Sequence, residues 1–183
     1  MKTVIFNGSP RKSGATSAIV SYLQENLPGE VIRIDSYTAS VSPCIDCRHC
    51  NTHADCALQD EMQEIYRHSN EADVIILASP IYFGQLTGSL LSLASRLQYF
   101  WTDRNRLTPK KRLGGVVLVD GGMGIYEDAF RMGKRLLHAM GAKCDLMVYH
   151  SGTDNPDRTN PLADEQTMNE IQSMTTQIKE FLL

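Results

Sequence analysis

Four cysteines lie close together in this chain and could bind one metal centre. They are Cys44, Cys47, Cys50 and Cys56, in the spacing C-x2-C-x2-C-x5-C, and they make up four of the five cysteines present. Four thiolates can converge on one site, and tight C-x2-C spacing is typical of iron–sulfur ligation. The pattern is consistent with a [4Fe-4S] cluster, a structural zinc site, free redox thiols or a disulfide formed on oxidation.

A second segment, residues 7–17, joins an apolar run to a helical pattern and is rich in phosphate-binding groups. It is neither a Walker A loop nor a G-x-G-x-x-G turn. A strand-to-helix turn of this kind presents free backbone N–H groups, which favour an anion. The alternative is a polar turn with a Ser or Thr helix cap. Hydroxyl donors suit the terminal phosphate of FMN better than a buried pyrophosphate, and the predicted contacts are Ser9, Arg11, Ser13, Thr16 and Ser17.

Two more loops follow apolar runs and could reach the same ligand. Ligands of doubly wound sheets lie outside the carboxyl ends of the strands, where these loops would meet. Tyr82 or Phe83 could flank a flavin ring, or the two aromatic residues could simply cover the edge of the sheet. Glycines in both loops would allow close backbone approach. The predicted contacts are Pro80, Ile81, Tyr82, Phe83 and Gly84 in one loop and Asp120, Gly121 and Gly122 in the other.

Continuous apolar runs rich in β-branched residues alternate with helical patterns along the chain. Runs of this type are typical of parallel strands that are covered on both faces. The alternation predicts an α/β fold, a flavodoxin-like three-layer sandwich with a five-stranded parallel sheet in the order 2-1-3-4-5. The expected strands include residues 4–6, 31–34, 74–78, 116–119 and 146–149, and the expected helices include 19–27, 86–100, 130–140 and 164–183.

Composition narrows the class of protein. The 183 residues, 42% of them hydrophobic, predict a single domain over residues 1–183 with a Cys-rich loop at about 40–60. The net charge of -3 argues against nucleic acid as a partner. No apolar run is long enough for a membrane span, and the N-terminus shows no signal-peptide pattern, so we expect a cytoplasmic protein.

Three segments together resemble the NADPH-dependent FMN reductase family and its relatives, the iron–sulfur flavoproteins. They are Gly8-Ser9-Pro10-Arg11, the cysteine loop followed by Asp60-Glu61-Met62, and Ser79-Pro80-Ile81-Tyr82-Phe83-Gly84 with Arg96 on the next helix. The resemblance implies a flavodoxin-like fold, non-covalent FMN, and a homodimer or homotetramer. This chain departs from the family pattern at Ala15, Leu91 and Ser95, which puts the family's contacts at those positions in doubt.

The function predicted on this basis is an FMN-dependent oxidoreductase. It would pass electrons from NAD(P)H through FMN to a flavin, a quinone or another acceptor. The alternative is an iron–sulfur flavoprotein electron carrier, with FMN and a [4Fe-4S] cluster on the cysteine loop, that exchanges electrons with redox proteins. No catalytic side chain is expected in either case, because the cofactor carries the chemistry.

Overall fold

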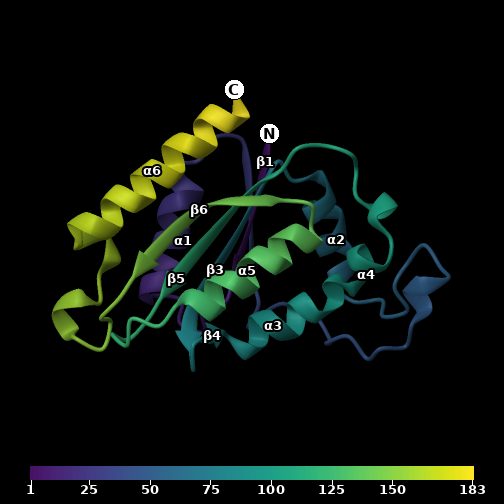
Figure 1. The fold of residues 1–183 in the computed structure, drawn as a ribbon, viewed down its shortest axis with the longest axis horizontal. Helices are drawn as coiled ribbons and strands as arrows, with labels where there is room; N and C mark the ends of the chain where they lie inside the picture. Colours follow the sequence, from purple (N-terminus) through teal and green to yellow (C-terminus); the bar gives the residue numbers. More distant parts are fainter.

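Five parallel strands form the centre of the molecule in the computed structural model, which describes residues 1–183 (Figure 1). Their order, β2-β1-β3-β5-β6, is the predicted 2-1-3-4-5 order. The strand β4 was not predicted: it is the two-residue segment Gln85–Leu86, antiparallel to the end of β3. The parallel strands are β1 (Lys2–Asn7), β2 (Glu30–Asp35), β3 (Val74–Tyr82), β5 (Leu113–Val119) and β6 (Lys143–His150).

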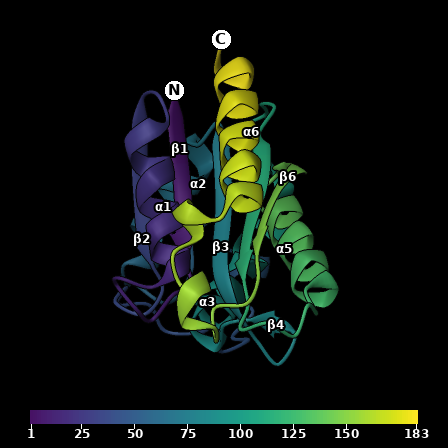
Figure 2. The same ribbon diagram turned by 90° about the vertical axis from the view of Figure 1, so that its left-hand side faces the viewer.

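Helices cover both faces of this sheet, which explains why its central strands are apolar without alternation. All seven residues of β5 are buried, as are the first six of β3. Helices α1 and α6 lie on one face, and the remaining helices lie on the other (Figure 2). None of the helices is long and apolar enough to cross a membrane. Their bounds are α1 (Ala15–Asn26), α2 (Met62–Glu71), α3 (Gly88–Ala94), α4 (Gln98–Thr102), α5 (Glu127–Ala139) and α6 (Glu165–Leu182).

The helix expected over residues 86–100 is divided differently in the structure. Leu86 belongs to β4, and α3 passes through the 3₁₀ turn η2 (Ser95–Leu97) into α4. Leu90, Leu93 and Phe100 are nevertheless buried in one cluster, as their spacing predicts. The helical periodicity therefore predicted the buried residues correctly, but the predicted start of the helix was wrong.

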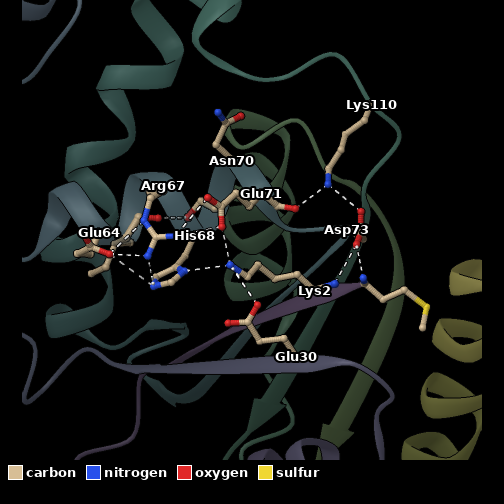
Figure 3. A network of polar contacts seen from close by, with 12 residues as sticks. Lys2, Glu30, Glu64, Arg67, His68, Asn70, Glu71, Asp73 and Lys110 are labelled. Atoms are coloured by element: carbon tan, nitrogen blue, oxygen red, sulfur yellow. Dashed lines mark hydrogen bonds and ion pairs between the residues drawn. The ribbon is translucent and has the colours of Figure 1, made fainter.

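A polar network ties the strands together at their amino ends, opposite the predicted site (Figure 3). The Lys2 ammonium group contacts Glu71 at 2.5 Å and Glu30 at 3.3 Å. Asp73 accepts hydrogen bonds from the backbone N–H of Lys2 at 2.8 Å and from the side chain of Lys110 at 2.7 Å. These contacts link β1, β2, α2 and the segments that lead into β3 and β5, and they leave the carboxyl ends of the strands free for a ligand.

Candidate functional site

The loop between β1 and α1 presents an uncapped helix N-terminus. Gly14 is the N-cap residue of α1, and no side chain caps the helix. The backbone N–H groups of Ser13, Ala15, Thr16 and Ser17 donate to no protein acceptor. Unpaired N–H groups and the helix dipole together favour an anion at this position. The alternative interpretation of the segment, a turn closed by its own Ser or Thr cap, does not fit this geometry.

Internal hydrogen bonds fix the shape of this loop. The buried hydroxyl of Ser17 donates to the carbonyl of Arg11 at 2.7 Å. The Ser9 hydroxyl donates to the same carbonyl at 3.1 Å, and the Ser9 N–H donates to Asn7 Oδ1 at 3.2 Å. Ser9, Arg11, Ser13 and Thr16 line the adjoining cavity, whereas Ser17 does not. Ser17 therefore positions the loop instead of facing the cavity.

The second predicted loop is the turn of a short hairpin. Ile81 pairs with Leu86 and Tyr82 with Gln85, which leaves Phe83 and Gly84 as a two-residue turn. Both turn residues have positive φ, 54° at Phe83 and 76° at Gly84, as a type I′ turn requires. Phe83 is fully exposed and Tyr82 is 45% exposed. The hairpin thus projects two aromatic side chains at the cavity and does not pack them on the edge of the sheet.

A buried hydroxyl joins the hairpin to the loop between β1 and α1. Thr87, just after β4, donates its hydroxyl hydrogen to the carbonyl of Gly8 at 2.9 Å. Its N–H donates to the Ser79 hydroxyl at 3.1 Å. A Cβ added at Gly8 would lie 2.9 Å from Thr87 Oγ1, so the contact needs glycine there. The first and second loops are consequently held at a fixed distance from each other.

Asp120 organises the third wall of the site. Its carboxylate accepts hydrogen bonds from Tyr149 Oη at 2.8 Å, Ser151 Oγ at 2.5 Å and the N–H of Gly124 at 2.9 Å. Burial opposes its ionisation, but the hydrogen bonds from Ser151, Tyr149 and Gly124 outweigh that effect and lower the pKa of Asp120. Asp120 is therefore ionised near neutral pH and joins the loop after β5 to the loop after β6.

These three loops and the segment after β6 enclose a cavity of about 1070 Å³. All the predicted contacts except Ser17 and Gly122 line it. The sequence prediction missed the wall formed by Thr153, Asp154 and Thr159, for which the available signal was the unusual length of the irregular segment after the fifth parallel strand. A Cβ at Gly121 would meet the carboxylate of Asp154, so these two walls of the cavity are in close contact.

FMN fits this cavity chemically. Its phosphate matches the unpaired N–H groups at the start of α1, together with Arg11 and Lys12 on the cavity wall. The hairpin of residues 80–84 and the glycine turn after β5 offer backbone and aromatic surface for a flat ring. The volume is also sufficient, since ligand pockets usually measure roughly 300–1,000 Å³.

The cysteine loop lies away from this cavity and is anchored by the buried side chain of Arg96. The guanidinium donates to the carbonyl of Ser42 at 3.0 Å and to Asp60 at 2.8 Å. It also donates to Cys56 Sγ at 3.3 Å and to the carbonyl of Leu58 at 3.1 Å. Arg96 is only 1% exposed, so one buried cation holds the beginning and the end of the loop together.

A second arginine holds the tip of the same loop. Arg106 donates to the carbonyl of Cys50 at 2.6 Å and to that of His53 at 2.8 Å, while its guanidinium lies over the ring of Tyr99. The Tyr99 hydroxyl donates to the carbonyl of Ala54 at 2.9 Å. The cysteine loop is therefore fixed against α4 by hydrogen bonds to its backbone.

The thiols themselves are free in this structure. Cys44 and Cys47 are exposed, and Cys50 and Cys56 are half-buried. No three His, Cys, Asp or Glu side chains are gathered closely enough to coordinate one metal ion. The donor set suits a cluster in its chemistry, but the arrangement does not bring the donors together. The metal-site prediction for these four residues therefore stays a prediction.

The remaining cysteine and the two histidines of the cysteine loop make separate contacts. Cys144 is half-buried against the core, and burial raises the pKa of its thiol to about 11. His49 forms a 2.8 Å contact with Asp55 and stacks on His53. These histidines contact other residues of their own loop, so neither of them completes a metal site.

The sheet order and the ligand loops at its carboxyl edge define a flavodoxin-like protein with a site for a phosphorylated ligand. Residues 1–153 match the family model of NADPH-dependent FMN reductase, and the chain belongs to that family.

Relatives that are about 30% identical agree with this family. An iron–sulfur flavoprotein of Archaeoglobus fulgidus is 31% identical over 144 residues, which cover 77% of this chain and 64% of the relative. An iron–sulfur flavoprotein of Methanocaldococcus jannaschii is 32% identical over 122 residues, covering 65% of this chain and 62% of the relative. The chain thus aligns with less than two thirds of the length of either relative.

Solved structures share the fold at lower identity. The Trp repressor binding protein of Bacillus subtilis superimposes with a TM-score of 0.65 at 18% identity, covering 94% of this chain and 99% of the other. The FMN-dependent NADH-azoreductase of Bacillus anthracis, solved in complex with FMN, gives a TM-score of 0.58 at 15% identity and covers 98% of both chains. These likenesses support the flavodoxin-like fold.

Proposed function

We propose that this protein uses bound FMN to pass electrons from NADH or NADPH to a small-molecule acceptor such as a quinone or a flavin. One observation carries the proposal: a single cavity joins the uncapped start of α1 to the hairpin of residues 80–84 and the glycine turn after β5. This arrangement provides a phosphate site and a ring site on one edge of one sheet. The family to which the chain belongs supports the same chemistry.

The residues of the chain bind and orient in this proposal, and none of them reacts. FMN, when bound, supplies the capacity to accept a hydride and release electrons singly or in pairs. The loop fixed by Ser9 and Ser17 would hold the phosphate through N–H groups and Arg11. The Thr87 contact keeps the hairpin at a set distance from that loop, so the ring would be held in a fixed orientation.

The test is a steady-state assay of FMN-loaded protein with NADH or NADPH and a quinone, made alongside Lys12→Gln. We expect turnover in the parent protein and weaker FMN binding in the variant, because Lys12 lines the phosphate end of the cavity. Lys179→Gln, on α6, removes the same charge away from the cavity and is the matched control. FMN-loaded protein that no nicotinamide reduces would contradict the proposal.

A second candidate function has support from the cysteine loop. In it the protein is an electron carrier with FMN and a [4Fe-4S] cluster, and redox proteins are its partners. The relatives named iron–sulfur flavoprotein support it, as does the anchoring of the loop by Arg96 and Arg106. The iron and sulfide content of anaerobically purified protein distinguishes the two functions. About four of each per chain would favour the electron carrier, and their absence would favour the reductase.

We also propose that the protein works in the cytoplasm as a homodimer or homotetramer. The cysteines that it leaves free suit a reducing compartment. An apolar groove of about 320 Å³ between α4 and α5, bordered by the exposed Trp101 and by Leu91, Met132 and Leu136, supports self-association. Sedimentation analysis tests the oligomer, and a monomer at micromolar concentration would contradict it.

A further inference from the structure

The mouth of the cavity carries an exposed apolar rim. Tyr82 and Phe83 contribute to it from the hairpin, and Met123 and Ile125 contribute from the loop after β5; all four line the cavity. Phe83 is fully exposed and Met123 is 83% exposed. The two loops meet here, since a Cβ at Gly84 would lie 3.9 Å from Ile125. Apolar side chains left uncovered around a cavity mark a surface for a flat, apolar molecule.

The charges around the cavity are divided between its two ends. The only cations on its wall are Arg11 and Lys12, both in the loop between β1 and α1. Carboxylates line the other side. Asp154 forms no ion pair, and Asp128 is paired with Arg131 at 3.2 Å only through an exposed contact. The ionised Asp120 also lines the cavity and has no ion-pair partner, so carboxylates outnumber cations on this part of the wall and the local field is negative.

We infer that this rim selects uncharged, flat aromatic acceptors and disfavours anionic ones. The inference rests on the proposed function, because Arg11 and Lys12 are available to no second anion once they hold a phosphate. Within the proposed acceptor classes it favours quinones over free flavin phosphates. The acceptor would lie against Tyr82, Phe83 and Met123, and Asp128 and Asp154 would repel a sulfonate, carboxylate or phosphate brought to the same surface.

Equilibrium binding to the oxidised, FMN-loaded protein tests the inference without turnover. The probes are anthraquinone-2-sulfonamide and anthraquinone-2-sulfonate, which have nearly the same shape and differ by one charge. Without a nicotinamide donor neither quinone is reduced, so difference absorbance of the flavin reports their dissociation constants directly. Asp128→Asn and Asp154→Asn remove the charges and keep the shape. Asp145→Asn, at the start of β6, removes an equal charge far from the rim and is the control.

We expect the sulfonamide to bind more tightly than the sulfonate at low salt. Each rim variant should tighten sulfonate binding by about three- to tenfold, as expected for one partly exposed charge, and should change sulfonamide binding by less than about twofold. Asp145→Asn should change neither. Equal binding of the two probes, or rim variants that leave sulfonate binding unchanged, would overturn the inference. Protein that holds no FMN would instead overturn the proposed function.

Discussion

Replacing Arg96 should destabilise the protein far more than replacing an exposed arginine. The change to methionine keeps the apolar stem and removes the guanidinium, which leaves Asp60 with only backbone donors and the carbonyls of Ser42 and Leu58 without their partner. Removing one member of a buried ion pair costs about 3–5 kcal/mol. Because the Asp60 side chain is 18% exposed, we expect the lower end, about 3 kcal/mol.

Urea unfolding followed by far-UV circular dichroism measures this loss. In a domain of this size it corresponds to a fall in Tm of roughly 6–12 °C. Arg67→Met is the control, since both of its ion pairs, to Glu64 and Glu71, are exposed and should contribute little to the free energy of unfolding. Limited proteolysis should also cut the cysteine loop of Arg96→Met sooner. A loss below about 1 kcal/mol would show that Arg96 does not anchor this loop.

Two further predictions concern the flavin site. Ser17→Ala should weaken FMN binding severalfold in a fluorescence titration, because it removes one of the two hydroxyl hydrogen bonds to the Arg11 carbonyl, worth about 1 kcal/mol. Ser173→Ala on the exposed face of α6 is the control, and equal affinities of Ser17→Ala and the parent protein would refute the positioning role. The pKa of Asp120 is lower in the folded protein than in the unfolded chain, so ionised Asp120 stabilises the fold at pH values above its pKa in the unfolded chain. This stabilisation is lost as the pH falls through the pKa of Asp120 in the folded protein. Urea unfolding should therefore show stability falling below about pH 4, and Tyr149→Phe, which removes a donor to the ionised carboxylate, should move that fall to higher pH. A variant profile that coincides with the parent profile would count against this hydrogen bond.

The sheet order and most of the cavity wall could be predicted because parallel strands have a strong local signal. The buried runs of β1, β3 and β5 show no alternation, and the loops that follow them must meet at one edge. The sequence predicts Ser17 as a ligand contact because it shows that a hydroxyl is present but not which way the side chain points. Its bond to the Arg11 carbonyl depends on how the loop folds back on α1.

The parts that could not be predicted depend on contacts between distant residues. Asp154 lines the cavity because the segment after β6 folds back onto the loop after β5, where the Asp154 N–H donates to the carbonyl of Gly121 at 3.1 Å. The two arginines that anchor the cysteine loop lie 36 to 56 residues away from the groups they hold, and no local sequence pattern indicates such pairs. The cysteine spacing indicated four ligands near each other, whereas the structure leaves the thiols apart.

Titration of the apoprotein with FMN and with riboflavin tests the central claim most directly, because the two differ only in the phosphate that the start of α1 is proposed to hold. We predict one FMN per chain and weaker riboflavin binding by about 10- to 100-fold, as expected for the loss of charge-assisted hydrogen bonds. Failure to bind FMN, or equal affinity for riboflavin, would contradict the assignment of this cavity as an FMN site.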